Sequence, residues 1–67
     1  MNYFVNDNAQ ANGDHEVHTA VCAHGPSVSN RTLLGDFTSC MPAVTAAKKL
    51  YARANGCYYC ATTCHTG

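Results

Sequence analysis

The segment Gly56-Cys57-Tyr58-Tyr59-Cys60, near the C-terminus, decides the fold that we expect for this chain. Two cysteines separated by two residues can turn both thiolates toward one metal ion. A second pair, in His18-Thr19-Ala20-Val21-Cys22, offers one imidazole and a third thiolate. Together the two pairs supply the ligand set of a closed structural Zn²⁺ site, namely His18, Cys22, Cys57 and Cys60. The sequence therefore predicts that zinc joins two segments that lie far apart in the chain.

The length of the chain explains why such a cross-link is expected. Its 67 residues, 46% of them hydrophobic, form one small metal-binding domain over residues 1–67. A chain of this size buries only about 60% of the surface that its unfolded form exposes, so the core alone is marginal. The sequence contains four histidines and five cysteines, and an odd cysteine number fits poorly with a closed disulfide framework. Metal binding is the first interpretation of this composition.

Charge and hydropathy argue against other classes of protein. Four Lys and Arg residues balance four Asp and Glu residues, whereas a dedicated nucleic-acid binder carries a basic excess. Apolar runs are far shorter than the roughly 20 residues that cross a bilayer. The first residues also lack the basic and apolar regions of a secretory signal. We therefore expect a cytoplasmic protein that binds no membrane and for which nucleic acid is a disfavoured partner.

Three segments have the composition of strands. Tyr3–Val5 and His15–Val21 are predicted to form a hairpin with a long loop between them. Thr32–Phe37 is a third candidate, with Gly35 at a bulge. The sequence thus predicts a three-stranded sheet of an α+β fold, packed on a single helix.

The helix is predicted after Phe37. Thr38 or Ser39 can cap its N-terminus, and Pro42 suits its first turn. Apolar positions then recur at helical spacing: Ala43, Ala47, Leu50, Tyr51 and Ala54. Asn55-Gly56 is typical of a helix C-terminus. We therefore expect the helix to end there, immediately before the last cysteine pair.

The two remaining cysteines leave alternatives open. Cys64 or His65 could replace His18 as the fourth metal ligand, although the last residues of a chain are often poorly ordered. Alternatively, Cys64 forms a disulfide with Cys40, or both stay reduced. Cys40 falls in the first helical turn, where the helix dipole favours a thiolate, so it is a candidate reactive cysteine.

The order of these features resembles the N-terminal metal-binding domain of the Ada DNA-alkylation-repair proteins and its stand-alone bacterial relatives. The matching segments are His18-Thr19-Ala20-Val21-Cys22, Asn30-Arg31, Phe37-Thr38-Ser39, Ala46-Ala47 and Gly56-Cys57-Tyr58-Tyr59-Cys60. The resemblance covers roughly residues 3–60. It implies a small zinc-binding fold with one ligand pair early in the chain and the other after the helix.

This chain departs from the Ada pattern at the position that carries the chemistry. In Ada the first ligand is a cysteine that accepts a methyl group from DNA, whereas here it is His18. Tyr58 and Tyr59 also replace the basic residues that Ada carries between the two cysteines of the second ligand pair, here Cys57 and Cys60. We therefore expect a non-enzymatic zinc-stabilised module that binds a protein partner. Alternatives are a thiol, redox or soft-metal protein using Cys40, Cys64 or the Cys57/Cys60 pair, and an Ada-like DNA-contacting domain.

Overall fold

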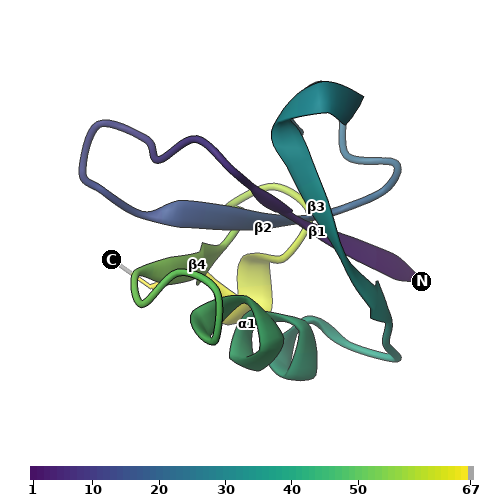
Figure 1. The fold of residues 1–67 in the computed structure, drawn as a ribbon. Coiled ribbons are helices and arrows are strands. Elements are labelled where there is room, and N and C mark those ends of the chain that lie inside the picture. The colour runs from purple at the N-terminus through teal and green to yellow at the C-terminus, as the bar shows by residue number, and fades with distance from the viewer. Residues whose placement is uncertain (67) are drawn as a thin grey trace.

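Four strands and one helix make up the fold in the computed structural model, which describes residues 1–66. The strands are β1 (Asn2–Asn6), β2 (His15–Thr19), β3 (Arg31–Asp36) and β4 (Ala54–Gly56), and the helix is α1 (Cys40–Lys48). Two short 3₁₀ turns, η1 (Val28–Asn30) and η2 (Thr62–Cys64), precede β3 and follow β4. The sheet has the order β3-β1-β2-β4, and α1 packs beneath it (Figure 1). The predicted α+β class is confirmed.

Strand β1 lies between β2 and β3 and pairs antiparallel with both. The predicted hairpin of β1 and β2 is therefore present, with Phe4 opposite His18. On the other side of β1, Tyr3 pairs with Gly35 and Phe4 pairs with Leu33, which leaves Leu34 as an extra residue. Gly35 has a φ of +135°, a backbone conformation that favours glycine. The bulge expected at Gly35 thus occurs where the pairing shifts.

The core between the sheet and α1 is built from small side chains. Val5 of β1, Val17 of β2, and Ala43 and Ala47 of α1 are all fully buried. Tyr3 is the largest apolar side chain in the buried set, and it lies beside Phe37 with the ring centroids 6.4 Å apart. A core of this kind buries little apolar area for each ordered residue. Cross-links are therefore well placed to contribute a large share of the stability.

The predicted extension of the helix to Ala54 is wrong. Helix α1 ends at Lys48, and the side chain of Leu50, expected in the core, is 57% exposed. Residues 54–56 form β4, so Asn55-Gly56 belongs to a strand and does not cap the helix. The predicted sheet consequently lacked its fourth strand.

Pairing with β2 and side-chain contacts beyond α1 explain why the chain leaves the helix early. His15 N–H donates to Arg53 O at 2.7 Å, and Cys57 N–H donates to Val17 O at 2.9 Å, which extends the parallel β2/β4 pairing at both ends. Tyr51 stacks on His15 with the ring centroids 3.8 Å apart, and its hydroxyl donates to Asp7 at 3.1 Å. The two backbone hydrogen bonds satisfy N–H and C=O groups along the open edge of β2. The pairing of β4 with β2 also places Cys57 at the end of β2 that bears His18.

The helix begins where the sequence predicts. Ser39 is its N-cap residue and has extended backbone angles, although its side chain makes no capping hydrogen bond. Pro42 lies in the first turn, where its missing N–H leaves no helical hydrogen bond unmade. Within residues 1–66, no helix is both long enough and apolar enough to cross a bilayer.

Candidate metal centre

The four predicted ligands meet at one end of the β2/β4 pair. His18 is on β2 and Cys22 lies in the turn that follows it, whereas Cys57 directly follows β4 and Cys60 comes one turn later. One potential ligand atom from each residue lies within 4.8 Å of the other three. The fold thus assembles a group of one histidine and three cysteines that could hold a metal ion.

The distances within this group fit tetrahedral coordination. Sγ of Cys22 lies 3.9 Å from Sγ of Cys57, and Sγ of Cys60 lies 3.9 Å from Nδ1 of His18. With Zn–S bonds of about 2.3 Å and tetrahedral angles, two zinc-bound sulfurs are about 3.8 Å apart. A small shift of the side chains therefore suffices to bring all four donors to bonding distance from one ion.

Backbone N–H groups point at two of the sulfurs. Thr19 N–H donates to Cys60 Sγ at 3.3 Å, and Tyr59 N–H donates to Cys57 Sγ at 3.4 Å. The second of these bonds lies within the turn of the Cys57–Cys60 pair, and Ala61 N–H closes that turn by donating to Cys57 O at 3.0 Å. Hydrogen bonds of this kind stabilise the anionic form of a thiol. They favour the charge state in which a cysteine binds metal.

Glu16 lies beside the ring of His18. Its Oε1 lies 3.5 Å from Nε2 of His18, while Nδ1 of the same ring faces Cys60. A carboxylate on the far nitrogen of a metal-binding histidine fixes the tautomer and strengthens the ligand. Our sequence interpretation missed Glu16. The signal was present, because residues two apart in a strand share a face.

The pKa directions fit a buried group of soft ligands. Burial lowers the pKa of His18, an effect partly offset by Glu16 and reinforced by His24, so the ring favours its neutral, metal-binding form. Burial raises the pKa of Cys60 to about 12, against the opposing hydrogen bond from Thr19, and the neighbouring Cys22 and Cys57 raise it further. Three thiolates packed this closely repel one another and need a cation between them. A metal ion held by these residues would supply that charge.

Two glycines allow close approach of chain segments at and beside the metal group. A Cβ on Gly56 would lie 2.8 Å from Ala61 O and from Cys64 Cβ. A Cβ on Gly25 would lie 3.3 Å from Cys22 O and 3.8 Å from the His18 side chain. Gly56, which we expected to end a helix, instead leaves space for the C-terminal segment to fold over β4.

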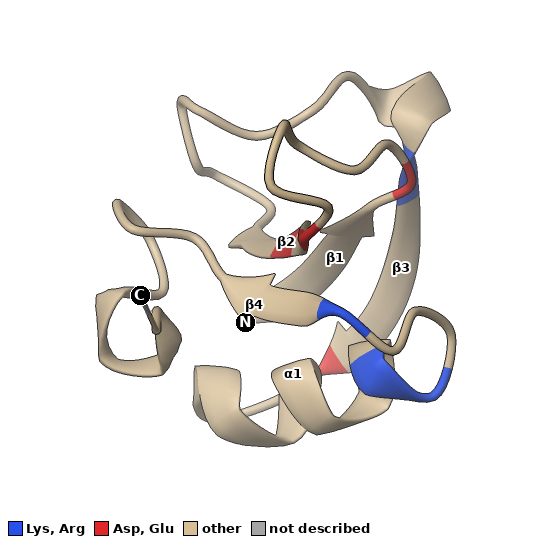
Figure 2. Cartoon of the chain, turned by 90° about the vertical axis from the view of Figure 1, so that its left-hand side faces the viewer, with Lys and Arg blue, Asp and Glu red and all other residues tan. Residues whose placement is uncertain are grey.

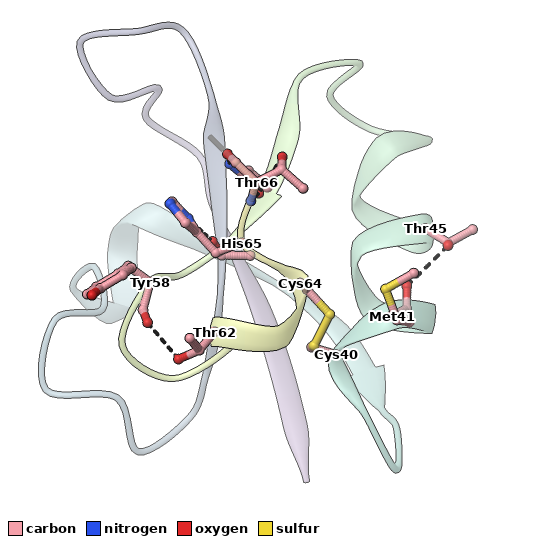
Figure 3. The surroundings of a disulfide bond; sticks show 10 residues. Cys40, Met41, Thr45, Tyr58, Thr62, Cys64, His65 and Thr66 are labelled. Carbon is pink, nitrogen blue, oxygen red and sulfur yellow. Dashed lines mark hydrogen bonds between the residues drawn. A yellow bond between two sulfur atoms is a disulfide. The ribbon is translucent and has the colours of Figure 1, made fainter.

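The alternative ligands lie elsewhere. Cys64 forms a disulfide with Cys40, which joins η2 to the start of α1 (Figure 3). Nδ1 of His65 lies 3.0 Å from Gly56 O and can donate to this carbonyl. The sequence left three outcomes open, namely metal ligation by Cys64, a Cys40–Cys64 disulfide or two reduced thiols, and the structure has the disulfide. Two cysteines in this bond and three in the metal-ligand group account for the odd number.

Exposed aromatic side chains cover the outside of the cysteine turn. Tyr59 stacks on His24 with the centroids 3.8 Å apart, and Tyr58 meets both Tyr59 and His65 edge-on. The side chains of Tyr58 and Tyr59 are 58% and 64% exposed. We call His24, Tyr58 and Tyr59 the aromatic surface. The sequence suggested Tyr58 and Tyr59 as a contact surface, but gave no sign that His24 joins them.

Comparison with protein-family models, curated proteins and solved structures finds no match to this chain. The resemblance to the Ada metal-binding domain rests on the order and spacing of the ligand pairs and of the short segments between them. The finding on which functional inference can build is the group of His18, Cys22, Cys57 and Cys60, brought together by the fold.

Proposed function

We propose that this chain is a non-enzymatic module stabilised by one zinc ion, and that its aromatic surface binds a protein partner. The observation that carries the proposal is the convergence of one imidazole and three thiols within 4.8 Å of one another. All four positions of a tetrahedral ion are then taken by protein. A catalytic zinc site keeps one position for water or substrate, whereas a structural site is closed.

Burial supports a structural role for the metal. The side chains of His18 and Cys57 are 2% and 1% exposed, so solvent has little access to that half of the site. Zinc binding to small domains of this type supplies about 10–16 kcal/mol near neutral pH. Against a small core of one tyrosine, three valines, three alanines and the buried cysteines, a contribution of this size decides whether the chain folds.

The distribution of charge supports a protein partner for the aromatic surface. Residues 17–30 and 57–66, which surround the metal group, contain no Lys, Arg, Asp or Glu. The charged residues lie mainly on the loop before β2 and around the end of α1 (Figure 2). Exposed tyrosines in an uncharged setting have the composition of a protein interface core.

The same distribution gives little support to an Ada-like contact with DNA. Lys48, Lys49 and Arg53 gather beyond the end of α1, but Arg53 is paired with Asp14 at 3.2 Å (Figure 2). Arg31 stands apart from them at the start of β3, with its guanidinium 3.9 Å from the centroid of the Phe4 ring. Within residues 1–66 neither lysine has an ion-pair partner, and two lysines at a helix end can neutralise few phosphates, so the expected affinity is low.

Metal analysis of untagged protein tests the structural part of the proposal. We expect one zinc per chain, and we expect chelation under nitrogen to remove the near-UV circular dichroism and the amide dispersion. A Cys40→Ala/Cys64→Ala variant serves as the control, because it should keep the zinc while lacking the disulfide. A fully folded spectrum after complete removal of metal would contradict the proposal. Copper in place of zinc would favour soft-metal handling.

Site-specific photo-crosslinking in cells tests the partner. A photoreactive residue at position 59 should give a discrete crosslinked protein, whereas the same residue at the exposed position 45 should not. Tyr58→Ser in the first protein should reduce the yield of that product. Equal crosslinking at both positions would contradict the assignment of the aromatic surface.

A further inference from the structure

A cavity of about 250 Å³ lies beside the Cys40–Cys64 disulfide, away from the metal ligands. Met41, Val44 and Lys48 line it from one face of α1, where they follow helical spacing. Thr63 and Cys64 line it from η2, and Ala54 and Asn55 from β4. None of these residues belongs to the group that could hold the metal. The cavity therefore needs an explanation of its own.

The two cysteines of the disulfide differ in their relation to this cavity. Cys64 is part of the cavity lining, whereas Cys40 is not, and both residues are more than 90% buried. Thiol–disulfide exchange begins with attack of a thiolate on one of the two sulfurs. A nucleophile in the cavity would meet Cys64 first. Cys40 would then be the leaving group.

The position of Cys40 suits its role as the leaving group. Cys40 is the first residue of α1 after the N-cap Ser39, in a helix of nine residues (Figure 3). The N-terminus of a helix carries partial positive charge and stabilises a thiolate. Because a better leaving thiolate departs faster, cleavage that releases Cys40 is the favoured direction.

The lining also indicates which thiol would enter. Lys48 is the charged residue of the lining, and Met41 and Val44 form an apolar wall beside it. An ammonium at the edge of an apolar cavity attracts a carboxylate and leaves space for a short carbon chain. A small thiol that bears a carboxylate combines these features.

We propose that Cys40–Cys64 is a redox-active disulfide opened through this cavity by a small carboxylate-bearing thiol. The thiolate of that molecule forms a bond with Cys64 Sγ, and the bond between Cys64 and Cys40 breaks, releasing the Cys40 thiolate. A second molecule of the thiol then attacks the sulfur of the first, which frees Cys64 as a thiolate. In sum, one protein disulfide is reduced to two thiols and two small thiols are oxidised to one small disulfide. This activity does not depend on the proposed zinc function.

Reduction kinetics of the zinc-supplemented chain of 67 residues test the proposal, with thioglycolate, 2-mercaptoethanol and cysteamine as the anionic, neutral and cationic thiols. We expect Lys48→Gln to slow the reaction with thioglycolate about 3–10-fold at low salt and to leave that with 2-mercaptoethanol unchanged. Reaction with cysteamine should become faster. Lys49→Gln is the matched control, since Lys49 follows Lys48 in the chain but is outside the lining.

The site of the first bond gives an independent measurement. Quenching with iodoacetamide, followed by peptide mapping, should place thioglycolate on Cys64 and the alkyl group on Cys40. A mixed disulfide found on Cys40 would overturn the proposed direction. Equal effects of Lys48→Gln and Lys49→Gln on all three thiols would overturn the role of the cavity.

Discussion

Gly56 and Cys64 lie so close together that a methyl group on Gly56 would stand 2.8 Å from Cys64 Cβ. This contact joins the candidate metal centre to the disulfide, because Gly56 directly precedes the candidate ligand Cys57 and Cys64 forms the disulfide with α1. The added methyl group would also meet Ala61 O, a backbone atom that cannot rotate away as a side chain can. The close approach therefore admits only glycine.

Gly56→Ala should consequently destabilise the protein. Forcing one extra methyl group into a packed site costs about 1–3 kcal/mol. Thermal or urea unfolding of the zinc-loaded protein measures the loss. Gly25→Ala is the comparison, because its added Cβ would meet Cys22 O at 3.3 Å and should cost less. Equal stability of Gly56→Ala and the unmodified chain would show that the C-terminal segment packs differently in solution.

Substitutions of the cysteines should separate the metal ligands from the disulfide. Cys57→Ser and Cys60→Ser should lose zinc and unfold, since each removes a thiolate from a closed set of four. Cys40→Ser and Cys64→Ser should keep stoichiometric zinc, as measured by elemental analysis. If Cys64→Ser lost the metal while His18→Ala kept it, the site would belong to the C-terminal segment and the Ada resemblance would be misplaced.

Glu16→Gln should weaken metal binding without abolishing it. The carboxylate lies 3.5 Å from Nε2 of His18, and removal of such an outer partner typically costs 10–100-fold in affinity. Competition with a chromogenic chelator measures the change. Asp36→Asn is a suitable control, because Asp36 pairs with the N-terminal amine and lies on β3, which β1 separates from β2. An unchanged affinity for Glu16→Gln would mean that Glu16 does not orient the ring.

Acid should release the metal and unfold the chain. The pKa of His18 is lowered in the fold by burial, from an ordinary value of 6.5, so neutral His18 contributes stability that is fully present above 6.5. This contribution is lost as the pH falls below 6.5 and through the pKa of the folded state. Protons also compete with the metal for the thiolates, which acts in the same direction. Zinc release followed with a dye between pH 7.5 and pH 5, alongside circular dichroism, should show both events together. A folded, zinc-bound protein at pH 5 would contradict this expectation.

Methyl transfer from DNA should be absent. The Ada reaction requires a metal-bound thiolate at the position occupied here by His18, and the lone pair of a ligating imidazole is committed to the metal. Incubation with DNA that carries methylated phosphotriesters, followed by intact-mass measurement, should detect no methyl adduct. An adduct on Cys22, Cys57 or Cys60 would show that one of the remaining thiolates can act as the nucleophile.

The sequence by itself determined the features that depend on local spacing. Residues within a few positions of one another predict the two candidate ligand pairs, the hairpin strands, the bulge at Gly35 and a helix N-cap at Thr38 or Ser39, and the structure selects Ser39. The two pairs could be assigned to one site because a chain this short has few places to bury three thiols and an imidazole. Glu16 was within reach of the same reasoning, since it shares a strand face with His18.

Only the tertiary structure decided where α1 ends and what Cys40 and Cys64 do. Alanine, leucine and tyrosine at helical spacing are compatible with a longer helix, and no local signal shows that the edge of β2 is open for residues 54–56 to pair with it. Parallel pairing between such distant segments depends on the whole sheet being in place. The disulfide likewise depends on the distance between η2 and the start of α1, which is fixed only when Gly56 lets the C-terminal segment close over β4.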